Sequence, residues 1–139
     1  MSDPPLTPDR LQAALAEYFA PWVQALGLRV AALDPAAVTV RLPHSDQLAR
    51  VGGMLCGQAM MAAADTAMVL ALISHFGEFR PCTTVQLSSS FLKPLSNQDA
   101  LIEARVLRAG KALAFGEIDI RGAVDGQSVY RASATCALL

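Results

Sequence analysis

Charge is scarce in this sequence: Asp, Glu, Lys and Arg make up 17% of its 139 residues, and the net charge is −1. No basic block is present, so the chain lacks the electrostatic footprint of a nucleic-acid-binding protein. With only two histidines, a histidine-based metal site is not expected. The cysteines Cys56, Cys82 and Cys136 lie far apart without a CxxC motif. That spacing indicates neither a disulfide framework nor a zinc site, and it suits a reducing compartment, the cytoplasm.

We also expect no signal peptide, because the first ten residues contain no basic stretch followed by an apolar one. One apolar run, residues 54–76, is long enough to cross a bilayer. Five polar residues interrupt it, among them Asp65, and an Asp in mid-bilayer costs roughly 3 kcal/mol. We therefore expect a helix that is buried inside a protein and does not enter the membrane.

Apolar residues, by contrast, are abundant: they make up 53% of the chain, which excludes a disordered protein. The length fits one domain over residues 1–139 with a sizeable core. Near the N-terminus, Thr7 can cap a short helix, Pro8 suits its first position and Pro21 ends it. We expect residues 1–26 to form a helical segment that packs on the rest of the domain.

Six β-like runs accompany the long apolar helix. Two precede it and four follow it, at residues 28–33, 37–42, 82–92, 100–107, 113–121 and 128–138. Turn-forming residues separate the runs, and the short connections imply antiparallel pairing. Such a sheet must cover its apolar face, and the long helix is the one element large enough. The sequence therefore predicts an α+β fold in which a six-stranded antiparallel sheet wraps around a long central helix, with a short helix at the N-terminus.

The long helix carries one acid, Asp65, among Ala, Met, Val, Leu and Ile. An ionised carboxylate is costly in such surroundings unless it is paired or has a function. The run begins with glycines, including Gly57, which let a ligand approach the backbone closely, and Gly77 ends the helix. Asp65 is therefore either a catalytic carboxylate or a structural acid that hydrogen-bonds within the protein.

Three blocks of sequence, in the same order, resemble the phenylacetyl-CoA-type acyl-CoA thioesterases of the hotdog fold. Cys56-Gly57-Gln58, six intervening residues and then DTAM from Asp65 resemble that family's HGG…DTAM signature. TVQLSSSFLKP at residues 84–94 is similar to its TVDLSxNYLRP strand, and residues 108–111 resemble its R-x-G-K turn. The resemblance covers the chain from roughly residue 27 onward. Cys56 stands where the family has histidine, Gln58 where it has the second glycine, and Arg50 where it has asparagine.

The resemblance implies a hotdog acyl-CoA thioesterase that hydrolyses a small, medium or aryl acyl-CoA to the free acid and CoA. No metal or redox cofactor is implied, because CoA enters as part of the substrate. Asp65 would act as a base on water or as a nucleophile that forms a mixed anhydride. The N–H of Gly57, in the first helical turn, would stabilise the oxyanion; the alternative is that this glycine only permits close packing of the turn. Gln58 would either assist with its side-chain amide or fill space.

Substrate-binding residues are expected around this pair. CoA carries a diphosphate and a 3′-phosphate, so cations and hydroxyls are the candidates. They are the cations Arg50, Lys93, Arg108 and Lys111 and the hydroxyls of Thr66, Ser88 and Ser90; Cys56, a thiol in the position of the family's histidine, is a further candidate. For each cation the alternative is plain surface charge, and for the two serines a polar sheet face. Cys56 is otherwise a small residue in place of histidine, since no triad is readable around it.

The spacing of Gly57 and Asp65 has a consequence for assembly. The two residues are eight positions apart, which is about 12 Å along a helix, so one thioester carbonyl cannot contact both. We therefore expect a composite site, with Gly57 of one subunit facing Asp65 of a second across a two-fold axis. This predicts a homodimer, which can pair into a homotetramer. The alternative function is a non-catalytic acyl-CoA-binding hotdog domain, motivated by Cys56 and Arg50.

Overall fold

The computed structural model describes residues 6–139. Part of the N-terminal stretch on which we based the signal-peptide prediction, residues 1–5, lies outside this range. The elements follow in the order α1 (Pro8–Tyr18), α2 (Pro21–Gln24), β1 (Arg29–Leu33), β2 (Ala37–Leu42), η1 (Asp46–Leu48), β3 (Ala49–Arg50), β4 (Met54–Leu55), α3 (Gly57–Phe76), β5 (Cys82–Phe91), β6 (Ala100–Ala109), β7 (Leu113–Gly122) and β8 (Ser128–Leu138).

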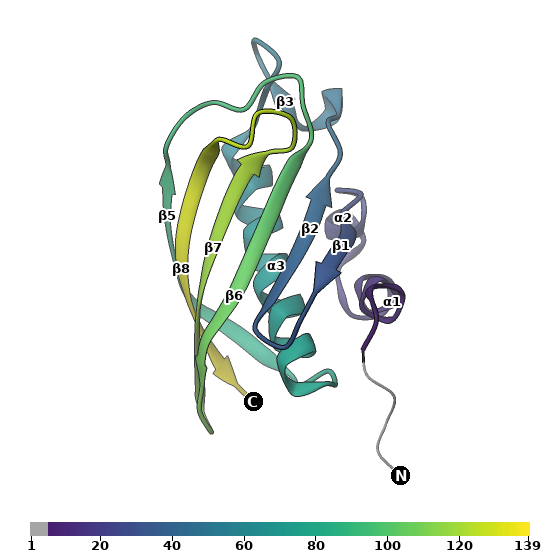
Figure 1. Ribbon diagram of the computed structural model, residues 1–139, viewed down its shortest axis with the longest axis vertical. Helices are drawn as coiled ribbons and strands as arrows, with labels where there is room; N and C mark the ends of the chain where they lie inside the picture. Colours follow the sequence, from purple (N-terminus) through teal and green to yellow (C-terminus); the bar gives the residue numbers. More distant parts are fainter. Residues whose placement is uncertain (1–5) are drawn as a thin grey trace.

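Six of the strands form one antiparallel sheet in the order β1-β2-β6-β7-β8-β5, and this sheet curves around α3 (Figure 1). The predicted α+β hotdog architecture is confirmed. Alternation along β7 buries Ile118 and Ile120 against the helix, while Glu117 and Asp119 stay partly exposed on the outer face. The sheet thus has one apolar face and one solvated face, as an antiparallel sheet over a single helix requires.

Its two edges differ. The β1 edge is tied to α1 by Gln12, whose Nε2 donates to Leu28 O at 3.0 Å and whose Oε1 accepts from Val30 N at 2.7 Å. The β5 edge has no further strand beside it within the described part of the chain. An unpaired edge of ten residues presents open backbone donors and acceptors to a partner strand.

The N-terminal helix forms as the sequence predicts. Thr7 caps it, its Oγ1 accepting from Arg10 N at 3.2 Å, and Pro8 occupies the first turn. The helix ends at Tyr18, before Pro21. Pro21 also begins a second helix, α2, that we did not predict. Proline suits this position because it lacks an N–H, and the first N–H of a helix has no intrahelical partner.

The central helix differs from our prediction at its start. It begins at Gly57, whereas Met54 and Leu55 form β4, a short strand paired with β3. Gly52 and Gly53 adopt positive φ angles of 94° and 78° in the turn between these strands, so they serve the hairpin and not the helix. At the far end Gly77 is left-handed, with φ 78°, and its N–H donates to Ile73 O at 2.8 Å, as predicted.

Helix α3 is long and apolar enough to span a membrane by length and composition alone, yet 61% of that window is buried inside the protein. Close packing against the sheet explains its apolar character. Met68 is fully buried and lies over Gly116 of β7, where a Cβ atom would overlap the Met68 thioether. The buried core runs along the concave face of the sheet, as expected for a core helix.

Candidate active site

Asp65 lies in the third turn of α3 and is partly exposed rather than fully buried. Its Oδ1 accepts a hydrogen bond from Thr84 Oγ1 of β5, at 2.7 Å. Thr84 Oγ1 in turn lies 4.0 Å from the Sγ of Cys136, which is fully buried. The carboxylate is therefore held on one side by a hydroxyl, and it is open on the other.

The open side faces a cavity of about 360 Å³, called here the Asp65 cavity. Its lining is mostly apolar and comes from three elements: Trp22 of α2; Gln58, Met61, Ala62 and Asp65 of α3; and Thr84 and Leu87 of β5. The four helix residues recur at i, i+3, i+4 and i+7 and so share one face. The structure thus brings Gln58 and Asp65, both predicted as catalytic, to one cavity.

The charge of Asp65 influences its protonated neighbours. Burial raises the pKa of the Cys82 thiol, and the nearby Asp65 carboxylate raises it further. Burial likewise raises the pKa of Cys136, and Asp65 adds to the effect, whereas the contact between Cys136 and the Thr84 hydroxyl acts in the opposite sense. These thiols stay protonated at neutral pH. They therefore do not compete with Asp65 as bases or nucleophiles.

The N-terminus of α3 presents free donors. Its N-cap, Cys56, has extended backbone angles, and no side chain among the described residues caps the helix. The N–H groups of the first turn are the ones that lack intrahelical partners, and the helix dipole favours negative charge there. Gly57 has no side chain to cover these N–H groups. The space beside it is also tight, because a Cβ at this position would lie 3.1 Å from Phe91 Cε1.

Gly57 borders a second cavity of about 430 Å³, called here the Gly57 cavity. It is lined by Arg50, Leu55, Gly57, Met60, Phe91, Leu92, Lys93 and Pro94. Two predicted substrate-binding cations, Arg50 and Lys93, therefore lie at the same cavity as the predicted oxyanion donor. The Gly57 and Asp65 cavities share no lining residue. Within one chain, the donor and the carboxylate belong to different cavities.

Other predicted residues lie elsewhere. Thr66 is buried and donates to Ala62 O of its own helix at 2.7 Å, so it faces neither cavity. Ser88 and Ser90 share a face, as predicted, but it is the outer, solvated face of the sheet. Ser89 between them points inward, and its Oγ lies 2.5 Å from the buried hydroxyl of Tyr130. The inward position of Ser89 follows from strand alternation once the outer face is known.

Arg108 and Lys111 lie at the turn between β6 and β7, at the opposite end of the sheet from the start of α3 (Figure 1). Both side chains are exposed. Within one chain, therefore, neither Arg108 nor Lys111 lines the Gly57 cavity, whereas Lys93 does. Cys56 lines neither of the two cavities described so far. It borders a third, smaller one beside Gln58.

Comparisons with known proteins bear on the family and the fold. A family model described as the thioesterase superfamily matches residues 52–128, which include Gly57, Asp65 and Thr84. A candidate esterase of Saccharolobus solfataricus is 30% identical over 102 residues, which cover 73% of this chain and 71% of that protein.

Among solved structures, a candidate thioesterase from a Silicibacter species superposes with a TM-score of 0.86 at 29% identity, covering 96% of this chain and 92% of that one. The PaaI protein of the Escherichia coli phenylacetic acid degradation operon superposes with a TM-score of 0.81 at 19% identity, covering 94% and 91% of the two chains. At that identity the second likeness establishes the shared fold.

Proposed function

This chain belongs to the thioesterase superfamily and is a hydrolase of thioesters, and we propose that its substrates are small, medium or aryl acyl-CoA thioesters. The observation that carries the proposal is the Asp65 carboxylate, which is held by Thr84 and open to a largely apolar cavity. An acyl group suits the apolar lining, and the carboxylate suits the attack on its carbonyl. The proposed reaction uses no metal or redox cofactor.

Asp65 has two possible roles in the proposed reaction. As a general base, it takes a proton from water while the water oxygen attacks the thioester carbon. As a nucleophile, it attacks that carbon itself, and water then hydrolyses the mixed anhydride. Both routes pass through a tetrahedral oxyanion, and collapse expels the CoA thiolate, which takes up a proton. Thr84 orients the carboxylate in either case.

The oxyanion would be bound at the start of α3 by the Gly57 N–H, and the Gln58 amide, which lines the Asp65 cavity, would assist from the chain that contributes Asp65. This assignment is supported by the absence of a side-chain cap within the described residues and by the missing side chain at Gly57. Arg50 and Lys93 line the same cavity. They are suited to bind the phosphates of CoA.

A second copy of the chain would complete the site. Gly57 and Asp65 border separate cavities in one chain, so a carbonyl in contact with both needs two chains. The open β5 edge supports such pairing, and Val85 on it is 57% exposed. A two-fold axis beside this edge would produce two equivalent sites per dimer. Arg108 and Lys111 would then reach CoA only from another chain.

The described cysteines are all free, which supports the assignment of a reducing compartment, the cytoplasm.

The experiment that tests the function measures thiol release from a panel of aliphatic and aryl acyl-CoAs, with the wild-type protein and Asp65→Asn side by side. We expect turnover by the wild type and a loss of about a hundredfold or more in kcat for the variant, with unchanged thermal unfolding and mass. Equal turnover by both proteins would contradict the role of Asp65. Binding of acyl-CoA without turnover by folded wild-type protein would instead indicate a non-catalytic acyl-CoA-binding domain.

A further inference from the structure

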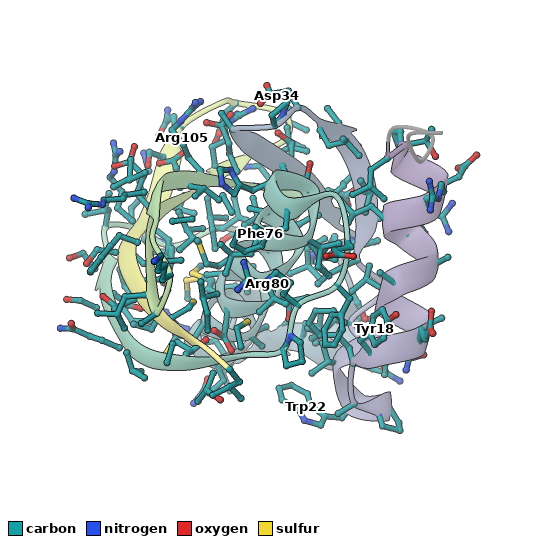
Figure 2. The ribbon with its side chains drawn as sticks, turned by 90° about the horizontal axis from the view of Figure 1, so that it is seen from below. Tyr18, Trp22, Asp34, Phe76, Arg80 and Arg105 are labelled. Carbon is teal, nitrogen blue, oxygen red and sulfur yellow. The ribbon has the colours of Figure 1, made fainter. Side chains whose placement is uncertain are left out.

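Trp22 is the one tryptophan of this chain, and 64% of its surface is exposed. It belongs to α2 and lies at the periphery of the molecule, on the N-terminal helical segment (Figure 2). Exposure of a large aromatic side chain leaves much apolar area in water. Yet Trp22 does not simply project into solvent, because it lines two cavities.

One of these is the Asp65 cavity. The other, called here the Cys56 cavity, has a volume of about 260 Å³ and is lined by Trp22, Ala25, Leu26, Gln47, Leu48, Cys56, Gln58 and Ala59. The two cavities have two residues in common, Trp22 and Gln58. They are therefore neighbours along the first turns of α3, with Trp22 and Gln58 at their common border.

The backbone that carries the indole is held in place by hydrogen bonds of its short helix. The N–H groups of Val23 and Gln24 both donate to Ala20 O at 3.0 Å, and the Gln24 amide donates to Phe19 O at 2.7 Å. Leu26, just after α2, is buried in the core. The backbone on both sides of Trp22 is thus held by hydrogen bonds and by the burial of Leu26. A large aromatic side chain on such a backbone limits the shape of what can bind beside it.

We propose that Trp22 is a specificity-determining residue that confines the acyl group to the Asp65 cavity and keeps it out of the Cys56 cavity. This inference rests on the proposed function. The lining of the Cys56 cavity includes Ala25, Leu26, Leu48 and Ala59, so it could accept a longer aliphatic tail if the indole were removed. The protein as it stands selects acyl groups short enough to end at the indole.

The test compares kcat/KM for butanoyl-, octanoyl- and dodecanoyl-CoA among the wild type, Trp22→Ala, Trp22→Phe and a control, Val124→Ala. Val124 is 84% exposed in the turn before β8, and it lines neither cavity. We expect Trp22→Ala to raise the ratio of dodecanoyl to butanoyl kcat/KM by about tenfold, since each methylene matters in an apolar pocket. Trp22→Phe should fall between, and Val124→Ala should match the wild type.

Because Trp22 is the sole tryptophan, its fluorescence gives an independent readout. In Asp65→Asn protein, we expect octanoyl-CoA to shift or quench the emission and free CoA to leave it unchanged. Equal responses to both ligands would overturn the inference, as would an unchanged chain-length ratio in Trp22→Ala.

Light scattering of each variant checks a third possibility. A Trp22→Ala protein that dissociates into monomers with an unaltered chain-length ratio would show that Trp22 is an interface residue, which overturns the inference as well. Wild-type protein that hydrolyses none of the thioesters would contradict the proposed function, whereas an active wild type with an unaltered Trp22→Ala ratio would contradict this inference alone.

Discussion

The hydroxyl of Thr84 donates to the Asp65 carboxylate across 2.7 Å, and this hydrogen bond joins the edge strand β5 to the middle of α3. The carboxylate is thereby oriented by a residue from a different element. In a largely apolar cavity a hydrogen bond to an ionised group is stronger than one between neutral groups. The geometry of the acid therefore depends on the position of the edge strand.

Replacing Thr84 by Val removes this donor while keeping the shape of the side chain. We expect kcat to fall by about tenfold to a hundredfold, which corresponds to the net value of a hydrogen bond to a charged group. Thr84→Ser, which keeps the hydroxyl, should retain most of the activity. Thr83→Val changes the exposed neighbouring position and serves as the control. Equal kcat values for Thr84→Val and Thr83→Val would show that the hydrogen bond has no part in catalysis.

Thr84 also shows where strand periodicity misleads. Counting alternate residues back from Leu87, which faces the helix, places Val85 inward and Thr84 outward. The structure has a bulge between Thr84 and Gln86 that shifts the register, so that Thr84 pairs with the buried Cys136 and points inward. Val85 is exposed instead. A bulge adds one residue without a reliable sequence signal, so the residue that holds Asp65 could not be found by pattern alone.

The role of the Gly57 N–H can be tested with little change to the helix. Gly57 is the first residue of α3, and Cys56 before it has φ −71° and ψ 149°. Proline is tolerated at the first helical position and favours this conformation in the residue before it. Gly57→Pro therefore removes the N–H from an otherwise intact helix.

We expect Gly57→Pro to lower kcat by about a hundredfold to a thousandfold, as loss of one oxyanion donor does. Gly57→Ala is the matched control, because it adds the same Cβ beside Phe91 but keeps the N–H. Circular dichroism should show equal helix content in both proteins. If the two variants lost activity to the same extent, crowding against Phe91 and not the donor would be the cause.

Much of the fold follows from the residues in order, because each run of strand and turn formers lies where the structure has a strand and a turn. The boundaries of β8 and the glycine that ends α3 are as predicted. The start of α3 is not, since residues 54–55 are as apolar as the helix, and pairing with Ala49 and Arg50, together with a bridge from Met54 to Ser96, makes them a strand. Pairing of only two residues leaves no periodic trace in the sequence.

Asp99 gives the stability a defined pH dependence. A hydrogen bond from the backbone N–H of His44 holds the pKa of Asp99 below its usual value, and the Arg41 guanidinium, at 2.7 Å, lowers it further. A carboxyl whose pKa is lower in the folded state contributes stability above its unfolded pKa of about 4. That contribution disappears as the pH falls through the lower, folded value.

We therefore expect Asp99→Asn to lower the free energy of unfolding by about 1 kcal/mol at pH 7. The difference from the wild type should shrink as the pH drops below about 4. Urea unfolding at several pH values measures it. Glu78→Gln, an exposed acid without such bonds among the described residues, is the control and should show no comparable pH dependence. A difference for Asp99→Asn that stayed constant down to pH 3 would contradict the linkage.

The composite site makes the sharpest prediction, because two variants that are inactive alone should regain activity when they form a mixed dimer. In a dimer of one Asp65→Asn chain and one Gly57→Pro chain, one site would pair the intact Gly57 of the first with the intact Asp65 of the second. The other site would carry both defects. Random mixing should restore about a quarter of wild-type turnover, since half of the dimers are mixed and each has one working site of two.

Co-refolding the two variants in equal amounts, followed by the thiol-release assay, measures this recovery. Each variant refolded alone is the baseline and should stay inactive, because every site in such a dimer carries the same defect. Sites built within single chains could not recover, because each chain would carry its own defect into its own site. Recovery therefore requires that Gly57 and Asp65 act across two subunits, and its absence in a verified mixed dimer would place both residues in one chain's site.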